Sequence, residues 1–295
     1  MSGVVRGILR PILLVPLVLV LSPGGTARAR PSIDPATCTL NGTTLTVKVP
    51  ASAGANLART SNGTILLNDQ ACRGATVTSV DKIKVSGGTG QQSVNIDLGQ
   101  GGFKPGKTDE PGTSDEIEFQ VLLGSTSNQD FLVFKADTSA VKGSNFRAGM
   151  GGFGVGQVNL NAGETNGVDA DVIFTPVHTT RFVGSGLGDT LSAQGGFGTG
   201  IIYGTTIEIL AGGGNDTVFG GNAFDNLQGG GAADDIHGGD GPDSIVGDAG
   251  KDSMIGNLGN DVLYANDGVS GETVNGGFDS DTCFADPGDI VSNCE

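Results

Sequence analysis

Residues 211 to 264 repeat with a period of nine, and this repeat constrains the fold more than any other feature. Each unit opens with a glycine-rich stretch, has aspartate at its sixth place and an apolar residue two places later. The aspartates are Asp216, Asp225, Asp234, Asp243, Asp252 and Asp261, and the apolar residues are Val218, Leu227, Ile236, Ile245, Met254 and Leu263. After an eleven-residue step that carries Glu272 and Val274, one further unit from Gly276 to Phe284 contains Asp281. The repeat therefore continues across a single stutter.

A period of nine matches no helical repeat, and the first half of each unit holds too much glycine for a helix. Glycine adopts positive φ without steric penalty, so the first six residues can close a tight turn. The last three residues form a short strand whose middle side chain faces inward, because alternate side chains of a strand point to opposite faces. Two turns and two strands make one coil, so the pattern predicts an all-β solenoid of stacked parallel strands.

Stacking brings the aspartates of successive coils together. At a strand spacing of roughly 4.8 Å, aspartates two units apart lie side by side. Two such charges repel by about 4 kcal/mol at an effective dielectric near 20. A hard divalent cation reverses the sign, and carboxylate and carbonyl oxygens are ligands of calcium rather than of zinc or copper. The sequence therefore predicts bound Ca²⁺. A disordered acidic tail is the alternative, and the constant register argues against it.

The units resemble the hemolysin-type, or RTX, calcium-binding repeat, GGxGxDxUx with U large and apolar. The resemblance covers Ala211 to Phe284 and reaches back more weakly to Gly184. It implies a parallel β-roll whose turns hold calcium between units n and n+2. The implied pairs are Asp216 with Asp234, Asp234 with Asp252, Asp225 with Asp243, Asp243 with Asp261 and, across the stutter, Asp261 with Asp281. The glycines implied in the metal sites are Gly212, Gly214, Gly221, Gly230, Gly239, Gly241, Gly250 and Gly259.

Several units depart from that pattern. Ala211 replaces the first glycine, Asp248 and Asn257 replace the second, and Ala223 and Ala232 replace the third. Alanine disfavours the positive φ that such turns require, which bears on the turn geometry and not on the carboxylate.

Charge is distributed unevenly along the 295 residues. The formal net charge is −16, and Lys251 is the only basic residue after Gly184. Phosphate would be repelled, which excludes nucleic acid as a partner. Such a surface suits a protein that is neutralised by bound cations.

The first 29 residues have the order of a secretory signal peptide. Arg6 and Arg10 precede an apolar run from Ile12 to Leu21, and Ala27-Arg28-Ala29 offers a small-x-small cleavage site. The run is short for a membrane span, so a retained anchor is the alternative. We therefore expect a secreted, extracellular protein without a membrane segment after cleavage.

The exported part contains four cysteines, an even number that suits an oxidising compartment. They allow three connectivities. Each end of the chain holds one pair, so the spacing favours two local bridges, Cys38 to Cys72 and Cys283 to Cys294. The second bridge would close the last coil.

Apolar alternation predicts further strands before the repeats, at 44–49, 83–85, 94–98, 117–121, 131–134, 158–160, 172–174, 181–183 and 207–209. The stretches that begin at Gly184 and Gly195 look like partial repeats. The polar segment from Phe103 to Glu116 is expected to be an exposed excursion whose acids are either solvated or bind another ion. The predicted organisation is a signal peptide at 1–29, an N-terminal β segment at 30–76, a degenerate β-solenoid with longer coils at 77–183, and an RTX-type roll with a disulfide cap at 184–295.

Signals for catalysis are few. The chain has two histidines, His178 and His237, and no HExxH, GxSxG or phosphate-cradling motif. The tail DTCFADPGDIVSNCE resembles the ends of stand-alone, Sec-exported RTX proteins of actinobacteria. We therefore predict a non-enzymatic, calcium-binding protein with a structural or adhesive role and a cell-wall or extracellular glycan as candidate partner. A glycan-active enzyme, with acids such as Asp169 and Asp171 on a β-helix, is the alternative.

Overall fold

The computed structural model describes residues 35–103, 117–123, 130–136, 144–150, 155–160, 171–175, 177–196, 199 and 201–295. The expected signal peptide, nearly all of the expected excursion at 103–116, and Asp169 lie outside these residues. Within the described part the regular structure consists of β-strands, and no helix there is long and apolar enough to cross a membrane.

The strands form two sheets. In spatial order the first sheet contains β1 (Thr37–Asn41), β2 (Thr44–Val49), β6 (Lys82–Gly87), β8 (Glu118–Leu122), β12 (Val172–Phe174), β11 (Gly156–Asn159), β10 (Asn145–Met150), β14 (Thr190–Ser192), β16 (Thr217–Phe219), β18 (Asp235–Asp240), β20 (Ser253–Leu258), β22 (Thr273–Phe278) and β24 (Ile290–Ser292). The second sheet contains β23 (Thr282–Ala285), β21 (Val262–Ala265), β19 (Ser244–Ala249), β17 (Asn226–Gly231), β15 (Ile207–Gly213), β13 (Thr179–Val183), β9 (Phe131–Lys135), β7 (Ser93–Asp97), β3 (Gly54–Arg59), β4 (Thr64–Leu67) and β5 (Gln70–Thr76).

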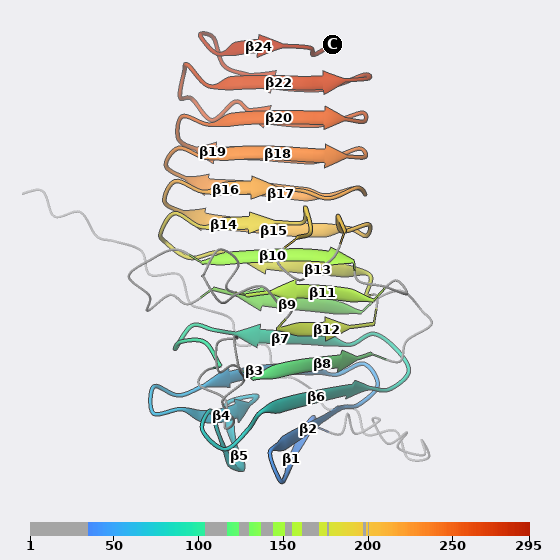
Figure 1. Ribbon diagram of the computed structural model, residues 1–295. Helices are drawn as coiled ribbons and strands as arrows, with labels where there is room; N and C mark the ends of the chain where they lie inside the picture. Colours follow the sequence, from blue (N-terminus) through green and yellow to red (C-terminus); the bar gives the residue numbers. More distant parts are fainter. Residues whose placement is uncertain are drawn as a thin grey trace, which may run out of the picture. The chain divides into compact units, whose positions relative to one another are not determined.

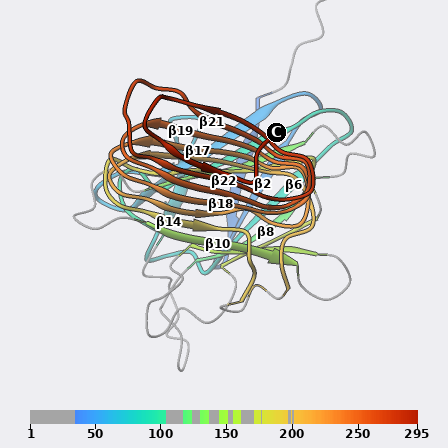
Figure 2. The same cartoon turned by 90° about the horizontal axis from the view of Figure 1, so that it is seen from above.

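The repeat region winds into coils, because the chain alternates between the two sheets from β14 onward (Figure 1). Seen from above, these coils lie over one another (Figure 2). Strands of successive coils pair in parallel, as β18 does with β20, where Ile236 faces Met254. The apolar residue of each unit fills the interior; Val218, Ile236, Ile245, Met254, Leu263 and Val274 are fully buried. The predicted parallel β-roll is confirmed.

Larger side chains fill the first half of the chain. The rings of Phe134 and Phe146 lie 5.8 and 5.5 Å from that of Phe182, both edge to face, and all three residues are almost completely buried. Edge-to-face pairs add stabilisation beyond the buried area. The predicted strands in this half are present, and β2 and β12 have the bounds expected from the sequence.

The first sheet departs from the prediction between β8 and β14. There β12 is parallel to β8, β10 is parallel to β14, and β11 between them is antiparallel to both. Three strands thus occupy the part of this sheet where a regular coil supplies one. The second sheet stays parallel throughout this region, from β7 through β9 and β13 to β15.

The coils begin earlier in the chain than the boundary expected at residue 77. β2 pairs in parallel with β6, and β3 with β7, so the first coil already lies within residues 44 to 59. The sheets are also continuous across residue 184, because β13 pairs with β15. No break in the sheets marks either boundary among the residues that are described.

The stretch that begins at Gly195 is not a rung of the roll, which corrects the prediction. Thr190 of β14 pairs with Thr217 of β16, a step of three units rather than two. Within the intervening stretch, Ile201 is 74% exposed and bridges Met150 in antiparallel fashion, while Tyr203 is buried and shares a 2.7 Å hydrogen bond with Thr180. This unit has no aspartate at its sixth place. Its residue Ile201 lies at the surface, and the chain is buried again at Tyr203.

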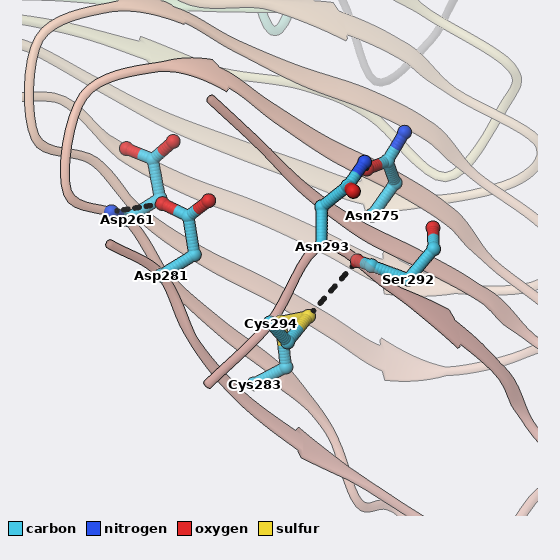
Figure 3. The surroundings of a disulfide bond; sticks show 7 residues. All are labelled: Asp261, Asn275, Asp281, Cys283, Ser292, Asn293 and Cys294. Atoms are coloured by element: carbon cyan, nitrogen blue, oxygen red, sulfur yellow. Dashed lines mark hydrogen bonds between the residues drawn. A yellow bond between two sulfur atoms is a disulfide. The ribbon is translucent and has the colours of Figure 1, made fainter. Parts of the chain in front are cut away.

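Both predicted disulfides are confirmed. Cys38 of β1 is bonded to Cys72 of β5, and Cys283 of β23 is bonded to Cys294, two residues after β24 (Figure 3). β1 and β5 are the outermost strands of the two sheets at one end, and β24 and β23 are the outermost strands at the other. Each bridge therefore joins the two edge strands at one end of the paired sheets.

We expect the double change Cys283→Ser with Cys294→Ser to loosen one end only. The bridged residues are 11 apart in the sequence, and closing a loop of that size stabilises by roughly 3 kcal/mol on the chain-entropy model. Hydrogen exchange should accelerate in β21 to β24 and stay unchanged in β3 and β7. The matched pair, Cys38→Ser with Cys72→Ser, should accelerate exchange at β1 to β5 instead. Identical exchange profiles for the two variants would contradict local capping.

Candidate metal centres

The repeat aspartates form two columns, because each lies directly before a strand. The first column precedes strands of the first sheet and contains Asp216, Asp234 and Asp252. The second column precedes strands of the second sheet and contains Asp225, Asp243, Asp261 and Asp281. These side chains are between 0 and 3% exposed. Aspartates two units apart are therefore neighbours, as predicted.

Backbone donors hold one oxygen of each carboxylate. The N–H of Asp216 donates to Asp234 Oδ1 at 2.8 Å, and the N–H of Asp234 donates to Asp252 Oδ1 at 2.9 Å. The second column repeats the contact at 2.7 to 2.9 Å, from Asp225 to Asp243, from Asp243 to Asp261, and across the stutter from Asp261 to Asp281 (Figure 3). Each aspartate side chain is thus oriented by a backbone N–H of the preceding coil, and we call each such pair of neighbouring coils a level of the column.

The second oxygen of most of these carboxylates is buried without a hydrogen-bond donor in the described part of the chain. These atoms are Oδ2 of Asp216, Asp234, Asp243, Asp252, Asp261 and Asp281. Asp225 differs, because its Oδ2 accepts a 2.6 Å bond from the N–H of Gly221. A buried acceptor without a partner costs about 1–3 kcal/mol, and more when it is charged. A bound cation would satisfy these oxygens.

The first-place glycines leave open the space beside these oxygens. A Cβ added at Gly238 would collide with Asp243 Oδ2 and with the carbonyl oxygen of Gly256 in the next coil. The same holds for Gly256, whose added Cβ would meet Asp261 Oδ2 and the carbonyl oxygen of Gly276. One carboxylate oxygen and one carbonyl oxygen thus converge on a space that only glycine keeps free. The predicted glycines omitted this first place, although the GGxGxD pattern contains it.

The predicted glycines shape the turns in two ways. Six of them adopt positive φ between 99° and 128°, namely Gly212, Gly214, Gly230, Gly239, Gly241 and Gly259. Gly221 and Gly250 do not, and an added Cβ there would collide with the carbonyl oxygens of Tyr203 and Ala232. At the departures from the pattern, Asp248, Asn257 and Ala232 still adopt positive φ of 63°, 78° and 80°. Ala223 does not, so its turn differs from the others.

Burial makes these carboxylates weak acids. It raises the pKa of Asp216 and of Asp225 from an ordinary value of 3.8 to about 7. Burial and the neighbouring Asp225 raise the pKa of Asp243 to about 8, and burial raises those of Asp234 and Asp261 to about 6. Without a counter-ion, ionising both columns at neutral pH therefore opposes the fold.

Sequence reasoning missed two members of the first column. Glu272, directly before β22, is fully buried and accepts a 3.4 Å bond from the N–H of Asp252. Asp189, directly before β14, donates its own N–H to Asp216 Oδ1 at 2.6 Å, while its Oδ2 accepts a 2.6 Å bond from the N–H of Ser185. The signal for Glu272 was its position two residues before Val274, the same spacing as in the repeat.

The donor set is that of a hard cation. The described residues contain no group of three or more His, Cys, Asp and Glu side chains placed to hold a metal. The spaces beside first-place glycines such as Gly238 and Gly256 are instead bordered by one carboxylate oxygen and one backbone carbonyl oxygen. All of these are oxygen donors, which suits calcium and does not suit thiophilic metals.

Comparison with known families decides the nature of the repeat. Residues 210–245 and 237–269 match the RTX calcium-binding nonapeptide repeat, in four copies. These units are RTX calcium-binding repeats. No curated protein and no solved structure has significant similarity to the chain. The matched RTX segment ends at residue 269, so the coil that carries Asp281 extends the same column beyond it.

The pH dependence of the calcium-free RTX roll follows from the raised pKa values. The native state holds protons more tightly than the unfolded chain between about pH 4 and pH 8, so its stability should fall as pH rises through this range. Without calcium, the urea midpoint should be higher near about pH 5 than near about pH 8. Saturating calcium should narrow or reverse this difference, because calcium binds the deprotonated carboxylates. A midpoint without calcium that rises with pH would contradict the assignment.

Proposed function

We propose that this chain is an exported calcium-binding protein whose RTX roll folds around calcium ions and serves a structural or adhesive role outside the cell. The buried carboxylate oxygens without donors carry the proposal. In it, Asp216, Asp225, Asp234, Asp243, Asp252, Asp261 and Asp281 supply the charged ligands. Backbone carbonyls such as those of Gly256 and Gly276 supply neutral ones. Bound calcium neutralises the columns, and the proposal assigns the chain no catalytic step.

The expected stabilisation is large enough to decide folding. Extracellular calcium modules bind with a Kd of about 10⁻⁴ to 10⁻³ M. Calcium at about 100 times Kd stabilises by roughly 2.7 kcal/mol per site. Four coupled sites would supply about 10 kcal/mol, which is comparable with the whole stability of a domain. The roll has a thin core, with one inward apolar residue for each short strand, so this contribution would dominate.

Two observations support a role outside the cell. Both disulfides join strands at the ends of the paired sheets, and such bonds persist in oxidising compartments. The signal-like segment at 1–29 supports export from the sequence alone.

An exposed groove supports the adhesive part of the proposal. It has a volume of about 550 Å³ and crosses β16, β18, β20 and β22 on the first sheet. Apolar residues Phe219, Leu258 and Phe278 and polar residues Gln194, Asn222, His237, Asp240 and Asn257 line it. Phe278 is 71% exposed, and the rings of Phe219 and His237 stack 4.8 Å apart. Aromatic faces pack against the C–H faces of sugar rings, and amides bond their hydroxyls, so a glycan suits this surface.

Calcium-dependent folding tests the central claim. The full chain, stripped of metal, should lose much of its far-ultraviolet β signal, and millimolar calcium should restore it. Hydrogen exchange should assign the restored protection to β16 through β23, where the columns lie. Magnesium at the same concentration should restore less, because it demands a tighter octahedral shell. Equal β content in excess chelator and in calcium would defeat the proposal.

Retention on an insoluble glycan tests the adhesive role. The calcium-loaded chain should bind purified cell-wall polysaccharide, and Phe278→Ser should weaken this binding by up to about tenfold, since an aromatic contact contributes about 0.5–1.5 kcal/mol. Phe284→Ser is the matched control, because Phe284 is also exposed but lies on the other sheet. Equal binding by both variants and the native chain would remove the groove from the proposal.

A further inference from the structure

The stutter alters the first column at one level. The turn 267–272 reads DGVSGE where the repeat pattern is GGxGxD, so Glu272 stands at the sixth place and Asp267 at the first. Thr273 of β22 pairs with Ser253 of β20, a step of 20 residues instead of 18. Glu272 therefore stacks on Asp252 as the repeat aspartates stack on one another.

Two buried oxygens at this level have no partner among the described residues. Glu272 is fully buried, and its Oε2 accepts no hydrogen bond. Asp252 is 2% exposed, and its Oδ2 is likewise without a donor. The remaining contact, from the N–H of Asp252 to Glu272 Oε1, is 3.4 Å long, whereas the corresponding contacts to Asp234 and Asp261 are 2.8 and 2.7 Å long. This level is thus held less tightly by the backbone and keeps two free acceptors.

The surroundings of the first-place glycine differ at this level. A Cβ added at Gly229, Gly238 or Gly256 would meet a first-place carbonyl oxygen of the coil two units further on. At Gly247, the first place of the Asp252 unit, the three nearest atoms all belong to Asp252. No carbonyl oxygen of the following coil is among these nearest atoms, and Glu272 brings to this level a side chain one methylene longer than that of aspartate.

The nearest basic side chain does not neutralise the level. Lys251, the only base after Gly184, lies beside the stutter turn, where a Cβ at Gly271 would be 3.3 Å from its Nζ. Lys251 is exposed, and Glu272 Oε2 remains without a partner. Two more acids belong to the same turn and the tail. The carboxylate of Asp267 accepts from the N–H of Val269, and that of Asp289 accepts from the N–H of Glu272 at 3.1 Å.

We propose that Asp252 and Glu272 form a further calcium site, which we call the stutter site. In this site Glu272 takes the place of both the repeat aspartate and the first-place carbonyl oxygen. The proposal rests on the proposed calcium binding of the roll. With one backbone ligand fewer, the stutter site fills after the regular levels. Because Asp289 of the tail accepts from the N–H groups of Gly271 and Glu272, at 2.9 and 3.1 Å, filling this site also orders the tail.

Native mass spectrometry of the full chain at saturating calcium provides the test. Glu272→Gln keeps the shape of the side chain and removes its charge, so this variant should carry one calcium ion fewer than the native chain. In a calorimetric titration it should lose the weakest phase. Asp69→Asn, at an exposed carboxylate between β4 and β5 and far from the columns, is the matched control and should keep the full count. An unchanged count and titration in Glu272→Gln overturn the stutter site.

A second variant decides the matter if Glu272→Gln does not fold. Asp267 is exposed, and asparagine can accept the same bond from Val269. Asp267→Asn should raise the Kd of the last calcium phase by about threefold, because a negative charge near the site is lost. The Kd values of the other phases should stay unchanged. An unchanged last phase would then overturn the proposal. A native chain that binds no calcium would instead defeat the proposed function itself.

Discussion

Repulsion between buried carboxylates is the constraint on which the roll depends. The repeat places like charges at successive coils, next to a core that has one apolar side chain per strand. The Oδ2 atoms of all the repeat aspartates except Asp225 have no hydrogen-bond donor among the described residues, so no protein group there offsets this repulsion. The first-place glycines keep open the space between a carboxylate oxygen and a carbonyl oxygen, where a side chain would collide with both. The proposed requirement for a cation therefore accounts for the turn composition and the thin core together.

In the first half of the chain, the aspartates that lie directly before strands have different surroundings. Asp130 and Asp171 also lie directly before strands and are 4 and 5% exposed. Their oxygens accept backbone bonds, from the N–H of Gln92 at 2.7 Å and from the N–H of Leu160 at 2.5 Å. Phenylalanines such as Phe182 meanwhile enlarge the core. Neither carboxylate has an oxygen among the buried side-chain atoms without a partner in the described residues, which distinguishes this half from the repeat columns.

The sequence predicted those parts of the structure that a fixed period determines. Register, the two columns and the buried apolar positions follow from the nine-residue spacing, and the two disulfides follow from the position of the cysteines at the ends. The antiparallel β11 could not be predicted, because its pairing depends on contacts across the sheet rather than on local pattern. Glu272 was not predicted to belong to the first column, because it is not an aspartate and because two extra residues shift it out of the nine-residue register. Ala232 adopts positive φ because the stacked coils impose it against the local preference.

The two bridges at the ends of the sheets have a mechanical consequence. A stack of coils yields to tension one rung at a time, because each rung contacts only its neighbours. Tension applied beyond Cys294 passes through the covalent bond to Cys283 in β23, so β24 cannot peel away alone. The same holds at the other end, where the bond between Cys38 and Cys72 couples β1 to β5. Tension on the chain would therefore act on both sheets at once. The strands at the two ends would resist unfolding together rather than detach one after another.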